Sequence, residues 1–361
     1  MSANQDKGVM FTQELAEAID WQAQHAEENG APCTARLIRA IPGVARGETA
    51  TGRRIASWQG LTLKDAMPLR FTGGLHHLLL SGEDRRLEPV YAGLTTDQST
   101  IDALVVELVE TFDTLLLPWL DGPPQTNEAG RSASIMAGLL WLSGKLGSRF
   151  EMNELGASAG VNTMMERYAY DLGGVQTGPQ DSPMQIAPEW RGEAPPSDPV
   201  EIVAIRGCDQ SPVDLSDPEA ALKLKAYVWP EATARMGRIE AAIALASEQA
   251  PDLVQQDAGH FVSDFLAREH PLGVSRVMYH SIMWQYMPAE TQAAITAAFE
   301  AAGAVASPER PLAWIALETD PKTFRHELKV RYWCGSEQDG ETYLLSFAHP
   351  HGAWVEWIGA D

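Results

Sequence analysis

The sequence has few cysteines, few basic residues and no long apolar run. Its three cysteines, Cys33, Cys208 and Cys334, lie far apart and form no C-x-x-C pair. This usage fits a reducing compartment and argues against a disulfide framework or a cysteine zinc site. Lysine and arginine number 27 against 49 aspartates and glutamates, which gives a net charge of −22. Because so acidic a surface repels phosphate backbones, nucleic acid is a poor partner.

Membrane and secretion signals are also missing from the sequence. No apolar run approaches the roughly 18 residues of a membrane-spanning helix. The N-terminus has neither a basic start nor an apolar core. We therefore expect a soluble, cytoplasmic protein without a membrane partner. At 361 residues, 45% of them apolar, the chain is long enough for one large core or two domains.

One stretch organises the rest of the chain, residues 150–162 with the sequence FEMNELGASAGVN. It is typical of a strand, a tight glycine turn and a helix that starts at about Val161. A helix start offers unpaired N–H groups to an electron-rich ligand, and Gly156 and Gly160 lack the Cβ atoms that would block close approach. Glu154 would lie at the carboxyl end of the strand, where open α/β sheets bind ligands.

Three mechanisms could use this turn. The dinucleotide fingerprint G-x-G-x-x-G needs glycine where Ser158 and Val161 stand, so a nicotinamide or flavin cofactor is disfavoured. The segment Gly156-Ala-Ser158-Ala-Gly160 is also G-x-S-x-G, the nucleophile elbow of α/β-hydrolases. Read from Glu154, the turn resembles the first motif of S-adenosylmethionine-dependent methyltransferases. In those enzymes the acidic residue and the glycine backbone hold the methionine end of the cofactor.

Residues 1–148 show helical periodicity and almost no strand signal, so we predict an all-helical N-terminal domain there. Its last helix opens near Gln125, and Glu128, Arg131 and Ile135 would lie on one side of it because of their spacing. Buried charges are costly unless they are paired or bind something. Two interpretations are open: an ion pair at a domain junction, or a contact with a cofactor or substrate.

Residues 149–361 alternate strand and helix patterns. We expect the helix after the first strand to run from about Val161 through Ala169. Residues 171–199 are rich in glycine and proline, which predicts an inserted loop or ribbon. Four further strands are expected, at Val200–Ile205, Leu253–Gln256, Val274–Tyr279 and Leu312–Leu317.

The end of the chain changes pattern. Two strand signals, Glu327–Trp333 and Thr342–Phe347, have no helix between them and predict an antiparallel hairpin. The predicted fold class is therefore α/β, a mostly parallel, doubly wound sheet of methyltransferase (Rossmann-like) type that ends in this hairpin. The predicted domains are 1–148, a helical cap, and 149–361, the sheet domain with the insert 171–199.

Acidic residues follow three successive predicted strands: Glu154, Asp209 and Asp257. In methyltransferases the second such acid accepts hydrogen bonds from the ribose hydroxyls, and the third lies near the adenine amine. A carboxylate suits both groups because it only accepts. The insert makes the distance from Glu154 to Asp209 longer than one strand–helix–strand unit, which is a departure from the usual spacing.

The order of elements is less favourable to a hydrolase. In that fold several strands precede the elbow serine, whereas Ser158 follows the first predicted strand. The order serine, acid, histidine could still be filled by Ser158, Asp257 and His280 or His349. These histidines, with His351, lack the spacing of a metal site, and we expect no metal.

Further motifs are spread over nearly the whole chain. They are Gln125-Thr-Asn-Glu128-Ala-Gly-Arg131-Ser, Glu154 to Asn162, Arg167-Tyr-Ala-Tyr170, Trp229-Pro, His280-Ser and His349-Pro-His351-Gly-Ala-Trp354. Together they resemble the bacterial family catalogued as domain of unknown function 2332. The resemblance implies a fold related to that of methyltransferases.

These observations favour a methyltransferase that uses S-adenosylmethionine on an unidentified small molecule. His280, a base near neutral pH, and Glu128 are the candidate catalytic residues. The alternatives are a non-catalytic ligand-binding protein on the same fold and a serine hydrolase using Ser158. The candidate cofactor-binding residues are Gln125, Asn127, Arg131, Glu154, Gly156, Ser158, Gly160, Asn162, Asp209 and Asp257.

Overall fold

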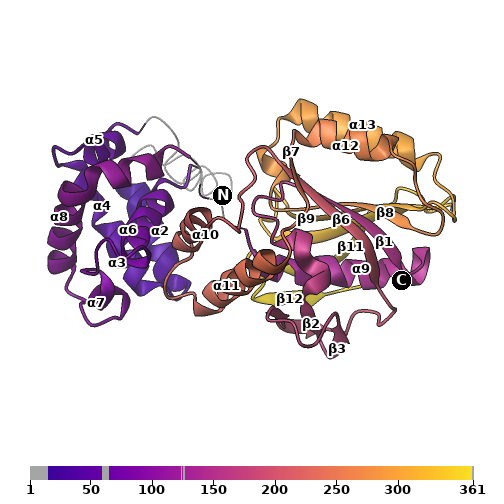
Figure 1. Cartoon of the computed structure of the whole chain (residues 1–361), viewed down its shortest axis with the longest axis horizontal. Helices are drawn as coiled ribbons and strands as arrows, with labels where there is room; N and C mark the ends of the chain where they lie inside the picture. The colour runs from indigo at the N-terminus through magenta and orange to yellow at the C-terminus, as the bar shows by residue number, and fades with distance from the viewer. Residues whose placement is uncertain (1–14, 59–64, 123, 125–126, 360–361) are drawn as a thin grey trace. The chain divides into compact units, whose positions relative to one another are not determined.

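The structure is a computed structural model that describes residues 15–58, 65–122, 124 and 127–359 (Figure 1). Contacts divide the chain into two compact units. The helical unit comprises Met1–Thr126 and Pro218–Gly237, and the sheet unit comprises Asn127–Asp217 and Arg238–Asp361. This division differs from the boundary at 148/149 that the sequence suggested. The helix before the first strand belongs with the sheet, and a later segment belongs with the N-terminal helices.

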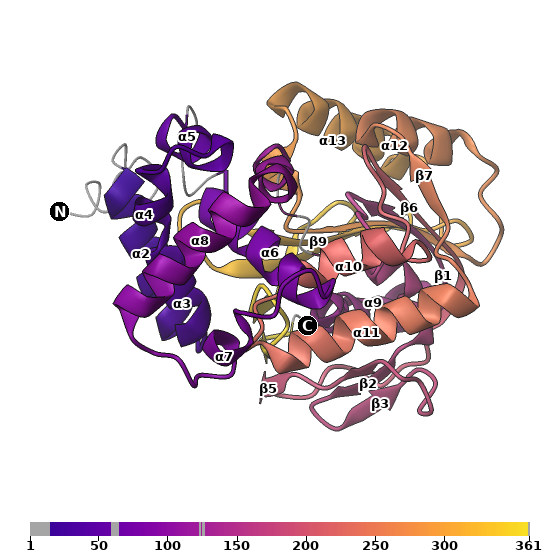
Figure 2. The ribbon, with the colours of Figure 1, turned by 60° about the vertical axis from the view of Figure 1, so that its left-hand side comes forward.

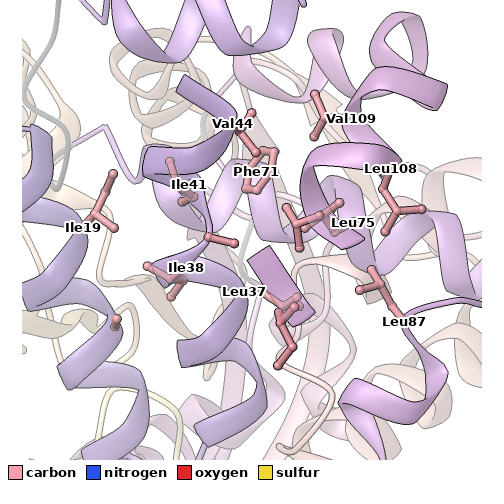
Figure 3. Close-up of a cluster of buried hydrophobic side chains, with 14 of the residues drawn as sticks. Ile19, Leu37, Ile38, Ile41, Val44, Phe71, Leu75, Leu87, Leu108 and Val109 are labelled. Carbon is pink, nitrogen blue, oxygen red and sulfur yellow. The ribbon is translucent and has the colours of Figure 1, made fainter. Parts of the chain in front are cut away.

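The helical unit is built from short amphipathic helices around one core. Figure 3 shows the centre of that core, which contains Ile38 from α3, Phe71 and Leu75 from α6 and Leu108 from α8. No strand occurs among the residues described in this unit. Its helices are α2 (Leu15–Glu28), α3 (Pro32–Arg39), α4 (Ile41–Ala45), α5 (Ala50–Ala56), α6 (Met67–Leu80), α7 (Glu88–Tyr91), α8 (Gln98–Leu116), η1 (Leu117–Leu120) and α10 (Pro218–Ala226).

The segment Pro218–Gly237 is held in the helical unit by close packing and by a helix cap. A Cβ on Gly73 would lie 2.9 Å from Tyr227 Cδ1, so only glycine lets the two segments approach this closely. The Glu231 carboxylate accepts from the backbone N–H groups of Cys33, at 2.6 Å, and Thr34, at 2.9 Å, at the start of α3. These N–H groups have no partner inside the helix, so the carboxylate satisfies them.

The sheet unit contains a nine-stranded sheet in the order β5-β12-β11-β10-β9-β8-β1-β6-β7. Strands β7, β6, β1, β8 and β9 run parallel, as the alternating pattern predicts. The chain leaves β1 towards β6 on one side and later fills β8 on the other, so the strand order reverses beside β1. These strands are β1 (Arg149–Leu155), β6 (Glu201–Asp209), β7 (Leu253–Gln255), β8 (Ser275–Ser281) and β9 (Leu312–Thr319).

Helices cover both faces of this sheet. Figures 1 and 2 show α12 and α13 on one face and α9 on the other. The first face is packed with aromatic side chains, including Phe265, Phe299 and Trp314. The described residues contain no helix with the length and apolarity to span a bilayer. The helices are α9 (Ser132–Leu146), α11 (Thr233–Glu248), α12 (Ala258–Ala267) and α13 (Ala289–Gly303).

The prediction of a helix after the glycine turn is wrong. Only the 3-10 helix η3 (Asn162–Arg167) forms there, and strand β2 (Ala169–Leu172) follows at once. The hydroxyl of Tyr170 donates to Met165 O at 3.0 Å and that of Tyr168 to Val161 O, so both tyrosines fold back onto the short helix. Tertiary contacts of these buried rings override the helical spacing of the methionines.

The insert and the chain end also form more strands than predicted. The strands β2, β3 (Val175–Thr177) and β4 (Gln185–Ile186) make a separate three-stranded sheet. The predicted hairpin is present as β10 (His326–Trp333) and β11 (Tyr343–Ala348). It is extended by β12 (Trp354–Trp357) and then by β5 (Glu189–Gly192) from the insert. The chain therefore ends in a three-stranded meander.

Candidate functional site

The glycine turn follows β1 at the point where the strand order reverses, the usual ligand position in open α/β sheets. Gly156 and Gly160 have φ values of +67° and +70°, and Ser158 has +53°. The Ser158 N–H donates to Asp209 Oδ2 at 2.9 Å, and Asp209 Oδ1 accepts from Ser211 N at 2.8 Å. Asp209, at the end of β6, therefore holds the turn in its left-handed conformation.

Side chains of the protein itself fill the space beside the two glycines of the turn. A Cβ on Gly156 would lie 2.8 Å from Met283 Cε, and one on Gly160 would lie 2.8 Å from Pro251. The sequence suggested that the start of a long α-helix offers its N–H groups to a ligand. The short 3-10 helix η3 follows the turn in place of that helix. Access to Gly156 thus requires movement of Met283, whose unbranched thioether side chain adapts readily.

Glu154 ends up at the centre of a buried polar cluster. Its side chain accepts from Thr163 Oγ1 at 2.8 Å and from the Tyr279 hydroxyl at 3.2 Å, both on Oε2. Glu154 is 2% exposed, and burial raises its pKa to about 7 against the opposing effects of these two donors and of Arg131. A carboxyl in this state takes up and releases a proton near neutral pH.

Asn162 lies beside this cluster. Its backbone carbonyl accepts from the Tyr279 hydroxyl at 3.2 Å. Its side chain is 1% exposed, and neither amide atom has a hydrogen-bond partner among the described residues. The amide nevertheless lies close enough to Glu154 to help lower the pKa of that carboxyl, so its oxygen is the group left without a partner.

The segment before α9 is joined to the turn. Asn127 Oδ1 accepts from Val161 N at 2.8 Å. Glu128, 3% exposed, accepts from Arg238 Nε at 2.7 Å. Arg131 donates to Pro350 O at 2.9 Å and to Ser281 O at 3.2 Å. Glu128 is thus paired with an arginine 110 positions away. Gln125 lies outside the described residues.

His280 is enclosed at the end of β8. The Trp314 Nε1–H donates to His280 Nε2 at 2.9 Å, and His280 Nδ1 lies 2.7 Å from Glu318 Oε1. Because the indole is only a donor, Nε2 must be the unprotonated nitrogen, and Nδ1 carries the proton towards Glu318. Both nitrogens are therefore engaged within the protein. The base role expected of His280 stays a prediction, because it would require one of these hydrogen bonds to break.

Asp257 follows β7 and caps α12. Its Oδ1 accepts from the backbone N–H groups of Gly259, at 2.8 Å, and His260, at 3.4 Å. The side chain is 44% exposed. Glu154, Asp209 and Asp257 thus lie at or just after the carboxyl ends of the neighbouring strands β1, β6 and β7, in that order across the sheet. Among the described residues no group of three or more His, Cys, Asp or Glu could hold a metal ion.

Sequence reasoning missed several members of this region. Tyr279 is not among the candidate residues, yet it pairs with Glu154 across β1 and β8. The predicted strands alone contain that signal, because parallel neighbours bring strand ends together. Nothing in the sequence indicates Thr163 or Arg238, whose partners depend on the path of the chain after β1 and on the start of α11.

The sheet and its polar edge define an α/β protein with a large, mostly parallel sheet whose central strand leads into a glycine turn beside a buried carboxyl. The chain belongs to the bacterial family described as "Uncharacterized protein conserved in bacteria (DUF2332)", whose model matches residues 16–357. Neither the curated proteins nor the solved structures contain a match to this chain.

Proposed function

We propose that this protein is an S-adenosylmethionine-dependent methyltransferase that acts on a small molecule. The observation that carries the proposal is the set of acids Glu154, Asp209 and Asp257: the first two lie in the last two residues of β1 and β6, and the third lies two residues after β7. Open α/β sheets bind nucleotides and nucleosides at this position. Acids in this order suit a ligand with an amino-acid end, two vicinal hydroxyls and an exocyclic amine.

Each acid has capacity for such a ligand. A carboxylate has about four lone-pair sites, so Asp209 retains acceptors for ribose hydroxyls after bonding Ser158 and Ser211. Asp257 bonds the N–H groups of α12 through Oδ1, which leaves its other oxygen for an amine. Asn162 offers its amide oxygen beside Glu154. The cofactor, when bound, supplies an activated methyl group, so the main contribution of the protein is positioning.

Glu154 gives the proposed site a pH dependence. With its pKa raised to about 7, it is largely neutral in mildly acidic solution and ionised above neutrality. S-adenosylmethionine is cationic at its sulfonium and amino groups, so the ionised carboxyl favours it. Affinity is expected to rise with pH through about 7 and to level off above it.

The test is titration calorimetry of the full chain with S-adenosylmethionine and S-adenosylhomocysteine. Asp209→Asn should weaken binding about ten-fold or more, because it replaces an acceptor of two hydroxyls by an amide and loosens the turn. The control is Glu309→Gln, whose side chain is exposed. The absence of heat with both ligands at millimolar concentration, under conditions where the protein is folded, would refute the proposal.

Two observations keep the alternatives testable. The occupied nitrogens of His280 favour a non-catalytic ligand-binding protein, which would bind the cofactor but turn over no acceptor. The left-handed backbone of Ser158, at φ +53°, is the strained turn that a nucleophile elbow needs. Ester cleavage abolished by Ser158→Ala, with cofactor binding unchanged, would favour the hydrolase.

A further inference from the structure

The helical unit contains a cavity of about 200 Å³ that the sheet-edge site does not include. It lies among the end of α5, the start of α6 and the end of η1. Arg54, Trp58, Asp65, Arg70 and Asp121 contribute to its wall. All five belong to one compact unit, so the cavity is formed within that unit.

Arg70 is the unusual member of this wall. Arg70 is 9% exposed, and its Nε is buried without a hydrogen-bond partner in the described part of the chain. Its Nη1 donates to Leu120 O at 3.0 Å, which is a neutral acceptor. Burial lowers the pKa of Arg70, but a guanidinium stays protonated in proteins. The wall therefore holds a buried cation that forms no direct ion pair in the described part of the chain.

A second arginine approaches the same region. The guanidinium carbons of Arg54 and Arg70 lie 5.6 Å and 5.4 Å from the centroid of the Trp58 ring. Cation–π contacts of this kind attract a charge to the ring face but supply no hydrogen-bond acceptor. They orient the two cations around one indole and leave their N–H groups to other acceptors.

The charges of Asp65 and Asp121 favour the protonated form of Arg70, but neither acid forms an ion pair with it among the described residues. Asp65 accepts from Trp58 Nε1 at 3.1 Å. Asp121 lies 3.8 Å from Arg54, and both of those side chains are more than half exposed, so their pairing is weak. Two positive and two negative groups leave the wall with no net charge. A singly charged, planar anion suits this balance better than a phosphate dianion, which the two acids would repel.

We propose that this cavity binds a small organic carboxylate, whose oxygens accept from Arg70 Nε and from the Arg54 guanidinium beside the Trp58 ring. Guanidinium and carboxylate match in planarity and in the spacing of their donors and acceptors. The volume limits the ligand to a small molecule. Binding here is independent of the proposed methyl transfer, since the cavity residues contribute nothing to the sheet edge.

The test is titration calorimetry of the full chain at low ionic strength and pH 8 with three probes: sodium acetate, sodium benzoate and inorganic phosphate. At least one carboxylate should bind, and more tightly than phosphate. Arg70→Met should weaken that binding about ten-fold or more, since a charge-assisted hydrogen bond is lost. Arg46→Met, which changes an exposed arginine of the same unit, should leave it unchanged.

A variant that binds the carboxylate more tightly would show that the arginine variants lose affinity through the binding site and not through misfolding. Asp65→Asn removes a negative charge from the wall but keeps an acceptor for Trp58, so it should tighten carboxylate binding a few-fold. If Arg70→Met does not fold, Arg54→Met replaces it, because Arg54 is exposed. The proposal is overturned by any of three results: no heat from either carboxylate, tighter binding of phosphate, or wild-type affinity in the folded arginine variant.

Discussion

Glu154 in the sheet unit and Arg70 in the helical unit are both buried charged residues, and the fold treats them differently. Glu154 receives hydrogen bonds from two hydroxyls, of Thr163 and Tyr279. Arg70 has one carbonyl acceptor and an aromatic ring. An acid can escape the cost of burial by taking up a proton, whereas a guanidinium cannot release one at any ordinary pH. The buried guanidinium of Arg70 therefore indicates an anionic ligand more strongly than the buried carboxyl of Glu154 indicates a cationic one.

The largest expected effect tests whether neutral Glu154 is sufficient for the fold. At pH 5.5, where the carboxyl is protonated, Glu154→Ala should lower the free energy of unfolding by about 4 kcal/mol, because it leaves a cavity and two buried hydroxyls without an acceptor. Glu154→Gln keeps an acceptor and should cost about 1 kcal/mol. Urea unfolding measures both. A glutamine variant as unstable as the alanine variant would mean that the fold needs the charge.

The next effect is the pH dependence of stability. The pKa of Glu154 is raised from 4.5 to about 7 on folding, so the folded state binds more protons than the unfolded state between these values. Stability from this group is present below pH 4.5 and is lost as pH rises to about 7, by up to about 3 kcal/mol. The difference between wild type and Glu154→Gln, measured by urea unfolding from pH 5 to 8, isolates this contribution. A flat difference would show that Glu154 stays ionised.

The smallest expected effect concerns Arg70. Arg70→Met removes a buried cation without an anionic partner and one donor to Leu120 O, two changes of opposite sign. Without added carboxylate, its free energy of unfolding should stay within about 1 kcal/mol of wild type. Arg46→Met is the matched surface control. A loss above about 3 kcal/mol would mean that Arg70 already pairs with an acid in the fold, and the contrast with Glu154 would disappear.

Much of the sheet could be predicted because its signal is local. The predicted strand at Leu253–Gln256 corresponds to β7 (Leu253–Gln255), and that at Leu312–Leu317 to β9 (Leu312–Thr319). Apolar runs between glycine, proline and polar clusters are typical of buried parallel strands, and they depend little on distant residues. The prediction failed after the turn, where the spacing of the methionines favoured a helix and contacts of Tyr168 and Tyr170 decided otherwise.

The candidate site divides in the same way. Glu154, Asp209 and Asp257 are found from sequence because each lies at or near the end of a strand, and strand ends meet at one edge of a parallel sheet. The hydrogen-bond partners of the site residues could not be predicted from the sequence. The spacing of Glu128 and Arg131 suggested that they pair, but Glu128 accepts a hydrogen bond from Arg238. The polar neighbours of His280 come from β9, which lies 34 and 38 positions further along the chain.

The sequence by itself determined the α/β class, most strand positions and the turn at Gly156–Gly160, because apolar periodicity and glycine act over a few neighbouring residues. Only the tertiary structure decided which charges are buried and what they bond. Burial and pairing depend on residues brought together from far along the chain, as with Glu154 and Tyr279 or Arg70 and Leu120. Those long-range contacts set the proton affinity of one group and leave the other in need of an anion.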